Sequence, residues 1–231
     1  MDSNILLTKR NVDIVFCIDG TGSMAPCIDN VKTNAKRFHM EFVSKMTDLN
    51  SEIDSMRVKV IVFRDYKDDG DEAMVESRFF ELDQDQEDFE EFLAGVTANG
   101  GGDNPENGLE ALYYAMQSDF TTGIKDRQVI VLFTDADALP LKERAGEGNY
   151  PSDMVDMDGF YKTWACQSQT SGSNLRERNK RLVMFAPEKT VYEELKTTMN
   201  RSFFKSVDMA SGLEDIDFQE IINLIAASAS N

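Results

Sequence analysis

The sequence predicts an α/β fold built on a mostly parallel sheet. Short apolar runs rich in β-branched and aromatic residues alternate with longer segments that carry apolar residues at helical spacing. Two runs, Val12–Ile18 and Gln128–Phe133, are apolar almost throughout, as is typical of strands buried on both faces of a sheet. Strands and helices that alternate in this way form right-handed crossovers, which place helices on both faces of a parallel sheet.

The first half of the chain is expected to hold three strands and three helices. Residues 1–11 are a short leader, and Pro26 is tolerated in the first turn of the first helix. The acidic turn at Gly70 is short enough to fold the third strand back against the second as an antiparallel edge partner. In chain order the elements are the strand Val12–Ile18, a helix from after Ser23 to about Asp48, the strand Arg57–Phe63, the edge strand Ala73–Leu82, the helix Gln84–Val96 and a helix from Pro105 to about Ser118.

The second half continues the alternation around one long irregular segment. Residues 136–158 contain two prolines and two glycines without a clear period, and a segment of that length inside a compact domain is usually a functional loop. The other elements are the strand Gln128–Phe133, a helix from about Gly159 to Gln169, the strand Arg181–Ala186, the helix Glu188–Met199, the short strand Ser202–Val207 and a closing helix Leu213–Ala229.

The composition is that of an ordinary globular protein with a strongly acidic charge. The 231 residues are 41% hydrophobic and 10% aromatic, and the net charge is −18. Such a charge argues against nucleic acid or an anionic membrane as partner. The three cysteines lack metal-ligand spacing, and Cys17 is expected in the core. We see no signal sequence and no bilayer-spanning run, so we expect a cytoplasmic protein.

Three oxygen-bearing side chains follow the first strand. Asp19, Thr21 and Ser23 stand at alternate positions of a turn that also contains Gly20 and Gly22. The glycines are expected to let the backbone turn sharply, so that the three side chains converge. One carboxylate and two hydroxyls suit a hard cation such as Mg²⁺ or Mn²⁺. The alternative is a glycine-rich turn with a helix-capping serine.

Two further loops bring acids to the same edge of the predicted sheet. Asp103 precedes a helix and Asp135 follows the second buried strand, where ligands of open parallel sheets bind. Asp103 alternatively caps its helix. Asp65 and Glu106 either accept hydrogen bonds at the site or serve ordinary surface and cap roles, and Asp137 is a weaker candidate than Asp135.

These motifs resemble those of von Willebrand factor A domains. Asp-x-Thr-x-Ser after a hydrophobic strand is similar to the signature of their metal-ion-dependent adhesion site, Asp-x-Ser-x-Ser. The Gly-Gly-Gly-Asp-x-Pro-Glu loop and the Phe-Arg-Asp-Tyr strand end look like the intracellular branch, which includes domains linked to atypical kinases and bacterial stress systems. The resemblance covers residues 11–225 of a single domain spanning 1–231. It implies a three-layer Rossmann-like fold with one antiparallel edge strand.

The resemblance also implies a divalent-cation site made by three loops. Its expected ligands for Mg²⁺ (or Mn²⁺ or Ca²⁺) are Asp19, Thr21, Ser23, Asp103 and Asp135. The second loop departs from the integrin-type version, which offers a Thr. Asp103 is closest to that role, with Thr97 and Asn99 as substitutes.

A domain of this kind is expected to bind proteins and not to be an enzyme. The cation would join the domain to a partner's oxygen, usually a carboxylate, and the loop 136–158 beside Asp135 is expected to shape partner choice. The alternatives are a Mg²⁺-dependent phosphohydrolase and a scaffold with a vestigial site. Against the first, Thr21 stands where haloacid-dehalogenase-type enzymes need an aspartate, and the motif loops contain no Lys or Arg. The sequence has only one histidine, which excludes a zinc site built on several. This residue, His39, is expected to be structural.

Overall fold

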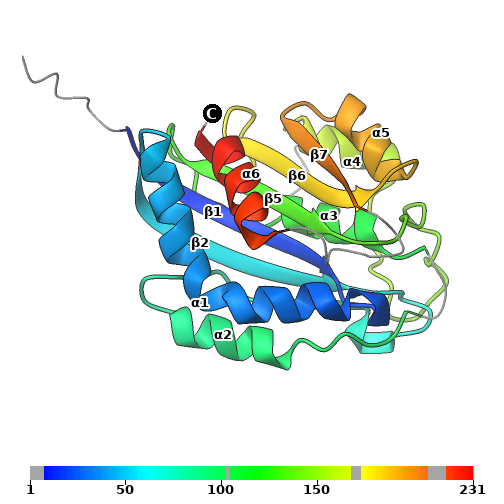
Figure 1. The fold of residues 1–231 in the computed structure, drawn as a ribbon. Coiled ribbons are helices and arrows are strands. Elements are labelled where there is room, and N and C mark those ends of the chain that lie inside the picture. The colour runs from blue at the N-terminus through cyan, green and yellow to red at the C-terminus, as the bar shows by residue number, and fades with distance from the viewer. Residues whose placement is uncertain (1–7, 102–104, 168–172, 208–216, 231) are drawn as a thin grey trace, which may run out of the picture.

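The chain forms a three-layer α/β structure around one mostly parallel sheet. The computed structural model describes residues 8–101, 105–167, 173–207 and 217–230. Among them the strand order is β3-β2-β1-β5-β6-β7, with β4 also paired to β2. Strands β2, β1, β5, β6 and β7 run parallel, whereas β3 and β4 are antiparallel to β2. Helices cover both faces of this sheet (Figure 1), so the predicted fold class is confirmed.

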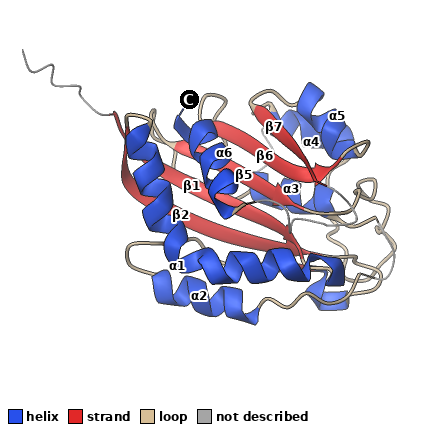
Figure 2. Cartoon of the chain, viewed as in Figure 1, coloured by secondary structure: helices blue, strands red, loops and turns tan. Residues whose placement is uncertain are grey.

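The described elements follow the predicted order along the chain. Figure 2 shows the strands at the centre with helices packed around them. Strand β7 has the predicted bounds, and β5 and β6 extend slightly beyond theirs. The strands are β1 (Thr8–Asp19), β2 (Ser51–Phe63), β3 (Met74–Glu76), β4 (Phe80–Glu81), β5 (Arg127–Phe133), β6 (Lys180–Pro187) and β7 (Ser202–Val207). The helices are α1 (Ala25–Asp48), α2 (Gln86–Gly95), α3 (Gly108–Met116), α4 (Met157–Trp164), α5 (Val191–Thr198) and α6 (Phe218–Ser230), with 3₁₀ turns η1 (Gly22–Met24) and η2 (Gly70–Ala73).

Strands β1 and β2 both begin before the apolar runs that predict them. Their first residues pair with each other in parallel, and Ser55 Oγ donates a 2.9 Å hydrogen bond to Asn11 Oδ1. Hydrophobic patterning reports burial, so it does not detect these polar but hydrogen-bonded ends. Residues 8–11 therefore belong to a strand instead of a leader, and residues 1–7 lie outside the described part of the chain.

The predicted edge strand Ala73–Leu82 is two short strands, β3 and β4. Ser77 lies between them. Its amide donates to the Val60 carbonyl, while its Oγ accepts the Val60 amide at 2.9 Å. A side-chain oxygen has thus replaced a backbone carbonyl in the ladder, and competition of this kind interrupts regular pairing.

Helix α3 begins at Gly108 instead of the predicted Pro105. Glu106 is extended and forms a parallel bridge with Ala138. Its amide donates to the Asp137 carbonyl at 3.1 Å, and its carbonyl accepts the Leu139 amide at 2.8 Å. The residue before α3 is therefore tied to the loop that follows β5.

Helix α4 begins earlier than predicted because Asp156 caps it. The Asp156 Oδ1 atom accepts the Gly159 amide at 2.9 Å, as N-cap carboxylates do. The helix ends at Trp164, before the predicted Gln169, which lies outside the described residues.

Helices α5 and α6, like α3, begin after their predicted first residues. Helix α5 starts at Val191 rather than Glu188, because Lys189 has a φ of 61° and cannot continue a right-handed helix. Helix α6 is described from Phe218, and the predicted residues 213–216 lie outside the described part.

Two apolar layers enclose the sheet. Side chains of β1 alternate between them: Phe16 and Ile18 face α1, α2 and α6, whereas Val15 and Cys17 face α3, α4 and α5. Cys17 is fully buried, as predicted. Asp13 is a polar residue of the same strand. It is also fully buried and receives two hydrogen bonds from Arg57, at 2.8 and 2.7 Å, which compensate its charge.

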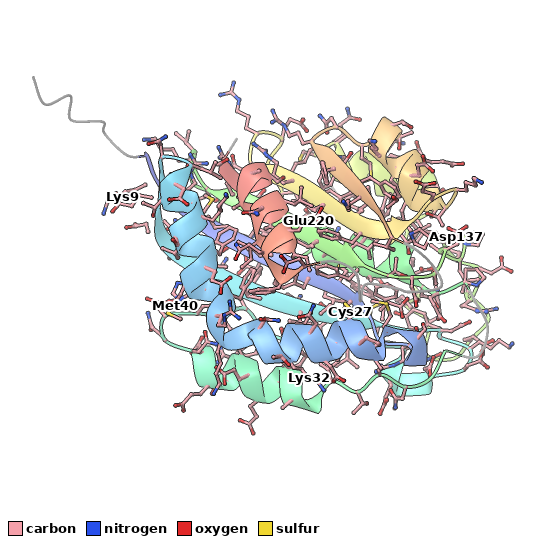
Figure 3. All side chains as sticks on the ribbon, in the orientation of Figure 1. Lys9, Cys27, Lys32, Met40, Asp137 and Glu220 are labelled. Atoms are coloured by element: carbon pink, nitrogen blue, oxygen red, sulfur yellow. The ribbon has the colours of Figure 1, made fainter. Side chains whose placement is uncertain are left out.

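The parallel strands direct their carboxyl ends to one edge of the sheet. Figure 3 shows Lys9, at the start of β1, and Asp137, after β5, at opposite ends of the molecule. The candidate site lies at the carboxyl edge. In the ranges that the structure describes, no helix is long and apolar enough to cross a membrane.

Candidate metal-binding site

The loop after β1 gathers its three predicted side chains around one carboxylate. Asp19 is the last residue of β1 and is fully buried. Its Oδ1 accepts hydrogen bonds from the Thr21 amide at 3.0 Å and from Thr21 Oγ1 at 2.7 Å. Thr21 Oγ1 lies 3.3 Å from Ser23 Oγ. The alternating spacing in sequence therefore becomes a local cluster of oxygens.

The loop after β5 joins this cluster. Ser23 Oγ donates to Asp135 Oδ1 at 3.1 Å, and Thr134 Oγ1 donates to Asp19 Oδ2 at 2.7 Å. Thr134 is not among the predicted site residues, because nothing in the local sequence distinguishes it from other threonines that follow strands. Of the predicted ligands, the structure brings together Asp19, Thr21, Ser23 and Asp135.

The second predicted loop is only partly described. Asp103 lies outside the described residues. The two substitutes, Thr97 and Asn99, bond each other at 3.3 Å through Thr97 Oγ1 and Asn99 Oδ1. The Asn99 amide also donates to the Gly20 carbonyl at 3.0 Å. The second loop is thus packed against the first.

The burial of Asp19 has an electrostatic consequence. Desolvation raises the pKa of Asp19 to about 6, and the nearby charge of Asp135 adds to the effect. Hydrogen bonds from Thr21 and Thr134 oppose it, since they stabilise the ionised carboxylate. Two carboxylates in one network repel each other, so a positive ion between them would favour their ionised forms.

Glu106 lies beside this network. It is 4% exposed, and its Oε2 has no hydrogen-bond partner in the described part of the chain. Burial raises its pKa to about 8, and the acids around it, first among them Asp19, add to the shift. Gly101 lies between Glu106 and Thr21, because a Cβ there would meet Glu106 Oε1 at 3.0 Å and Thr21 Cγ2 at 2.6 Å. Glu106 is therefore a buried carboxyl group directed towards the site.

The other two candidate acids are engaged elsewhere. Asp65 is fully buried and forms a two-point ion pair with Arg144, with Arg144 Nε 2.7 Å from Asp65 Oδ1. Asp137 Oδ1 accepts the amides of Ala138 at 2.8 Å and Val191 at 3.0 Å, so it caps the start of α5.

Of the two glycines in the first loop, Gly20 has a different role from the predicted one. Neither Gly20 nor Gly22 has a left-handed φ. Gly20 is needed for close approach, because a Cβ there would lie 2.6 Å from Val62 Cγ1 and 2.8 Å from Arg64 Cζ. Left-handed backbone occurs instead in the second loop, at Gly100 and Gly101, with φ of 74° and 75°.

The donor set fits a hard divalent cation. The described residues bring no three carboxylate, imidazole or thiol groups together as a metal cluster. The network instead combines the carboxylates of Asp19 and Asp135 with the hydroxyls of Thr21 and Ser23. Mg²⁺, Mn²⁺ and Ca²⁺ all accept oxygen ligands of this kind, and Glu106 Oε2 is a further oxygen without a partner among the residues described.

A family comparison identifies the domain. The sequence model of the von Willebrand factor A domain matches residues 13–145, which is more than half of the chain. The chain belongs to the von Willebrand factor A domain family. The match extends from β1 into the loop after β5, so it includes every residue of the predicted site. No curated protein sequence matches the chain.

Solved structures of two proteins are similar to this von Willebrand A domain, and the first shares its fold. The pilus adhesin SpaC from Lactobacillus rhamnosus GG matches in two crystal structures, both at 12% identity and over 96% of this chain, with TM-scores of 0.56 and 0.55. A von Willebrand factor type A protein from Catenulispora acidiphila matches at 16% identity over 93% of this chain, with a TM-score of 0.49. The chain spans about a third of the adhesin, 31% and 30% in the two structures, and 42% of the protein from Catenulispora acidiphila.

Replacement of Gly101 by Ala is expected to destabilise the metal-free domain by about 1–2 kcal/mol. A left-handed φ costs a non-glycine residue about 1 kcal/mol, and the new Cβ would also lie 2.6 Å from Thr21 Cγ2. Gly22→Ala is the matched control, because nothing lies within 4 Å of its added Cβ. Urea denaturation in chelator measures both. Equal stability of the two variants would contradict the close packing of Gly101 on Thr21.

Proposed function

We propose that this von Willebrand A domain is a divalent-cation-dependent protein-binding module with a site of the metal-ion-dependent adhesion type. Asp19, Thr21, Ser23 and Asp135, together with Asp103, would hold Mg²⁺, Mn²⁺ or Ca²⁺. When bound, the cation supplies a Lewis-acidic position for an oxygen of a partner protein. The supporting observation is the continuous chain of oxygen contacts from Asp19 through Thr21 and Ser23 to Asp135, at the edge where open α/β sheets bind ligands.

Each described residue has a separate task in this proposal. Asp19 and Asp135 contribute negative charge, and the Thr21 and Ser23 hydroxyls fill the space between them. Thr134 fixes the orientation of Asp19 through its 2.7 Å hydrogen bond. Glu106 would accept a hydrogen bond or complete the oxygen set from the α3 side.

The same geometry supports binding over phosphoryl transfer. A phosphohydrolase needs cationic groups directed at the transferring phosphoryl group. Arg64 and Arg144 both lie at this edge, but Arg64 donates to backbone carbonyls and Arg144 to Asp65. We therefore propose that the domain has no hydrolase activity of its own.

The proposed partner is a protein, and the proposed location is the cytoplasm, as in the intracellular branch of the family. The net charge of −18 disfavours nucleic acid and anionic membranes. The loop 136–156 leaves β5 beside Asp135 and is tied by Glu106 to the start of α3, so it would border a partner held at the site. SpaC is by its name an adhesin, and an adhesive use of the same fold is consistent with this role.

Cation titration tests the proposal. Calorimetry on chelator-treated protein is expected to show one saturable site per chain for Mg²⁺ or Mn²⁺. Absence of binding would favour the scaffold with a vestigial site. Turnover of a phosphoester that survives repurification and is lost in Asp19→Asn would favour the phosphohydrolase.

Peptide capture tests the binding step. Peptides that bear a free carboxylate should be retained on the immobilised domain in Mg²⁺ and released by chelator. Peptides that stay bound after chelator is added would refute cation-dependent capture.

A further inference from the structure

We infer that Arg64 is the positioning residue of the proposed metal site: its guanidinium holds the loop after β1 in register with the loop before α3. The inference rests on the proposed function for its effect on cation affinity. Its structural basis stands independently, in four hydrogen bonds. Arg64 follows the last residue of β2, a strand end that contributes none of the predicted ligands, and is 3% exposed.

Among the described residues, the guanidinium donates its hydrogen bonds to backbone carbonyls of three separate segments. Nε donates to Gly20 at 3.1 Å and to Asn99 at 2.9 Å. Nη2 donates to Thr97 at 2.7 Å, and Nη1 donates to Glu72 at 2.8 Å. We call these four contacts the Arg64 clamp. The clamp joins the first and second site loops to each other and to the turn η2.

The clamp acts on the ligands through Gly20. This residue lies between Asp19 and Thr21, so a shift of its peptide group would displace the Thr21 amide from Asp19 Oδ1. Its amide donates to the Phe63 carbonyl at 2.9 Å, and its carbonyl accepts both Arg64 Nε and the Asn99 amide. The peptide is thus fixed on both sides.

The absence of a side chain at position 20 also follows from the clamp. A Cβ on Gly20 would lie 2.8 Å from Arg64 Cζ and 2.9 Å from Nη2. The first glycine of the Asp-x-Thr-x-Ser motif is therefore required by close packing, against Val62 Cγ1 at 2.6 Å and against an arginine 44 residues away, and not by a left-handed turn.

Arginine suits this position for a geometric reason. Its planar fork presents five donors in fixed directions, whereas a lysine ammonium presents three on a flexible stem. The partners that the structure describes for the Arg64 charge are carbonyls. Burial of a charge is costly, and a well-packed apolar side chain often gives equal or greater stability. Because an apolar residue could stabilise this position as well, the role of Arg64 is to set the spacing of the two site loops.

The test compares Arg64→Lys and Arg64→Met with a matched control, Arg181→Met. Arg181 is also buried, at 5% exposure, and also donates to backbone carbonyls, of Ser228 at 3.0 Å and Lys180 at 2.7 Å, but it lies near the amino end of β6. Three quantities are measured for each variant: the melting temperature, the Mg²⁺ affinity by calorimetry, and amide hydrogen exchange in chelator.

Both Arg64 variants are expected to weaken Mg²⁺ binding by about tenfold to a hundredfold, as loss of residues that orient metal ligands does. Exchange of the Asn99 amide should accelerate, while the Leu182 amide, bonded to Arg201 at the other end of the sheet, should not change. Arg181→Met should lower the melting temperature and leave Mg²⁺ affinity within twofold of wild type.

Wild-type Mg²⁺ affinity in Arg64→Lys, or an equal loss in Arg181→Met, would overturn the inference. Arg64→Lys keeps the charge and most of the stem, so it carries the affinity test should Arg64→Met not fold. If the wild-type protein binds no Mg²⁺, the proposed function fails instead. Amide hydrogen exchange at Asn99 in the Arg64 variants then decides alone whether the clamp exists. An exchange rate equal to that of wild type would refute the clamp.

Discussion

Asp19→Asn is expected to lower Mg²⁺ affinity by at least about a hundredfold while leaving the metal-free domain folded. The substitution removes one of the two carboxylate charges in the described network but keeps the shape of the side chain. At the effective dielectric constant of about 20 that suits protein sites, a contact between opposite charges is worth several kcal/mol, and each 1.4 kcal/mol is about tenfold in affinity. Calorimetry with Mg²⁺ measures the loss.

The metal-free variant should be no less stable than wild type at neutral pH. Burial raises the pKa of Asp19 to about 6 in the folded protein. Its ionised form therefore destabilises the fold. This destabilisation grows as the pH rises above the pKa of the carboxyl in the unfolded chain, and it reaches its full size above a pH of about 6. Asn removes that charge.

A buried carboxylate elsewhere supplies the control for Asp19→Asn. Asp126 is 5% exposed and accepts the Gly123 amide at 2.6 Å, just before the start of β5. Asp126→Asn should leave Mg²⁺ affinity unchanged. Equal affinity of Asp19→Asn and wild type would remove Asp19 from the site and reassign the first loop.

Much of the fold was predictable because buried parallel strands have a strong sequence pattern. The central strands β1, β5 and β6 are covered on both faces, so their apolar runs stand out from the surrounding sequence. The misplaced boundaries depend on contacts that local sequence does not contain. The start of α3 is delayed by the bridge of Glu106 with Ala138, and the edge strand is divided by the Ser77 hydroxyl.

Some residues of the candidate site were likewise predictable from the sequence, and others were not. Asp19, Thr21 and Ser23 were predictable because they are close in sequence and follow a strand, and the structure connects them to Asp135. Thr134 and Arg64 were not. The role of Thr134 is defined by a partner 115 residues away, and that of Arg64 by site-loop partners 33 to 44 residues away.

The loop after β5 is anchored by contacts that its irregular sequence does not reveal. Arg144 pairs with the buried Asp65, and the Tyr150 hydroxyl donates to Glu110 Oε1 at 2.7 Å. The rings of Tyr66 and Tyr150 meet edge to face at 5.0 Å. These contacts attach the loop to the end of β2 and to α3, beside the proposed site.

Arg144→Met is therefore expected to destabilise the domain by about 2 kcal/mol and to expose residues 142–149 to proteolysis. It leaves Asp65 charged, buried and without its cation, which typically costs 3–5 kcal/mol. The lower figure is used because the Arg144 side chain is 17% exposed, so that solvent already screens part of the ion pair. Urea denaturation in chelator measures the change. Lys162→Met, which breaks an exposed pair with Asp158, should have no measurable effect.

A second variant separates the lost charge pairing from the lost packing. In Asp65→Asn/Arg144→Met neither charge remains, so most of the lost stability should return, although the loop should stay sensitive to protease because its anchor is still missing. Mg²⁺ affinity should be unchanged in both variants, since Asp65 is bound by Arg144 and does not join the Asp19 network. A double variant no more stable than Arg144→Met would show that the pair contributes packing instead of charge compensation. A fall in Mg²⁺ affinity in either variant would show that the loop helps to hold the cation, and would extend the site beyond the residues that its motif predicts.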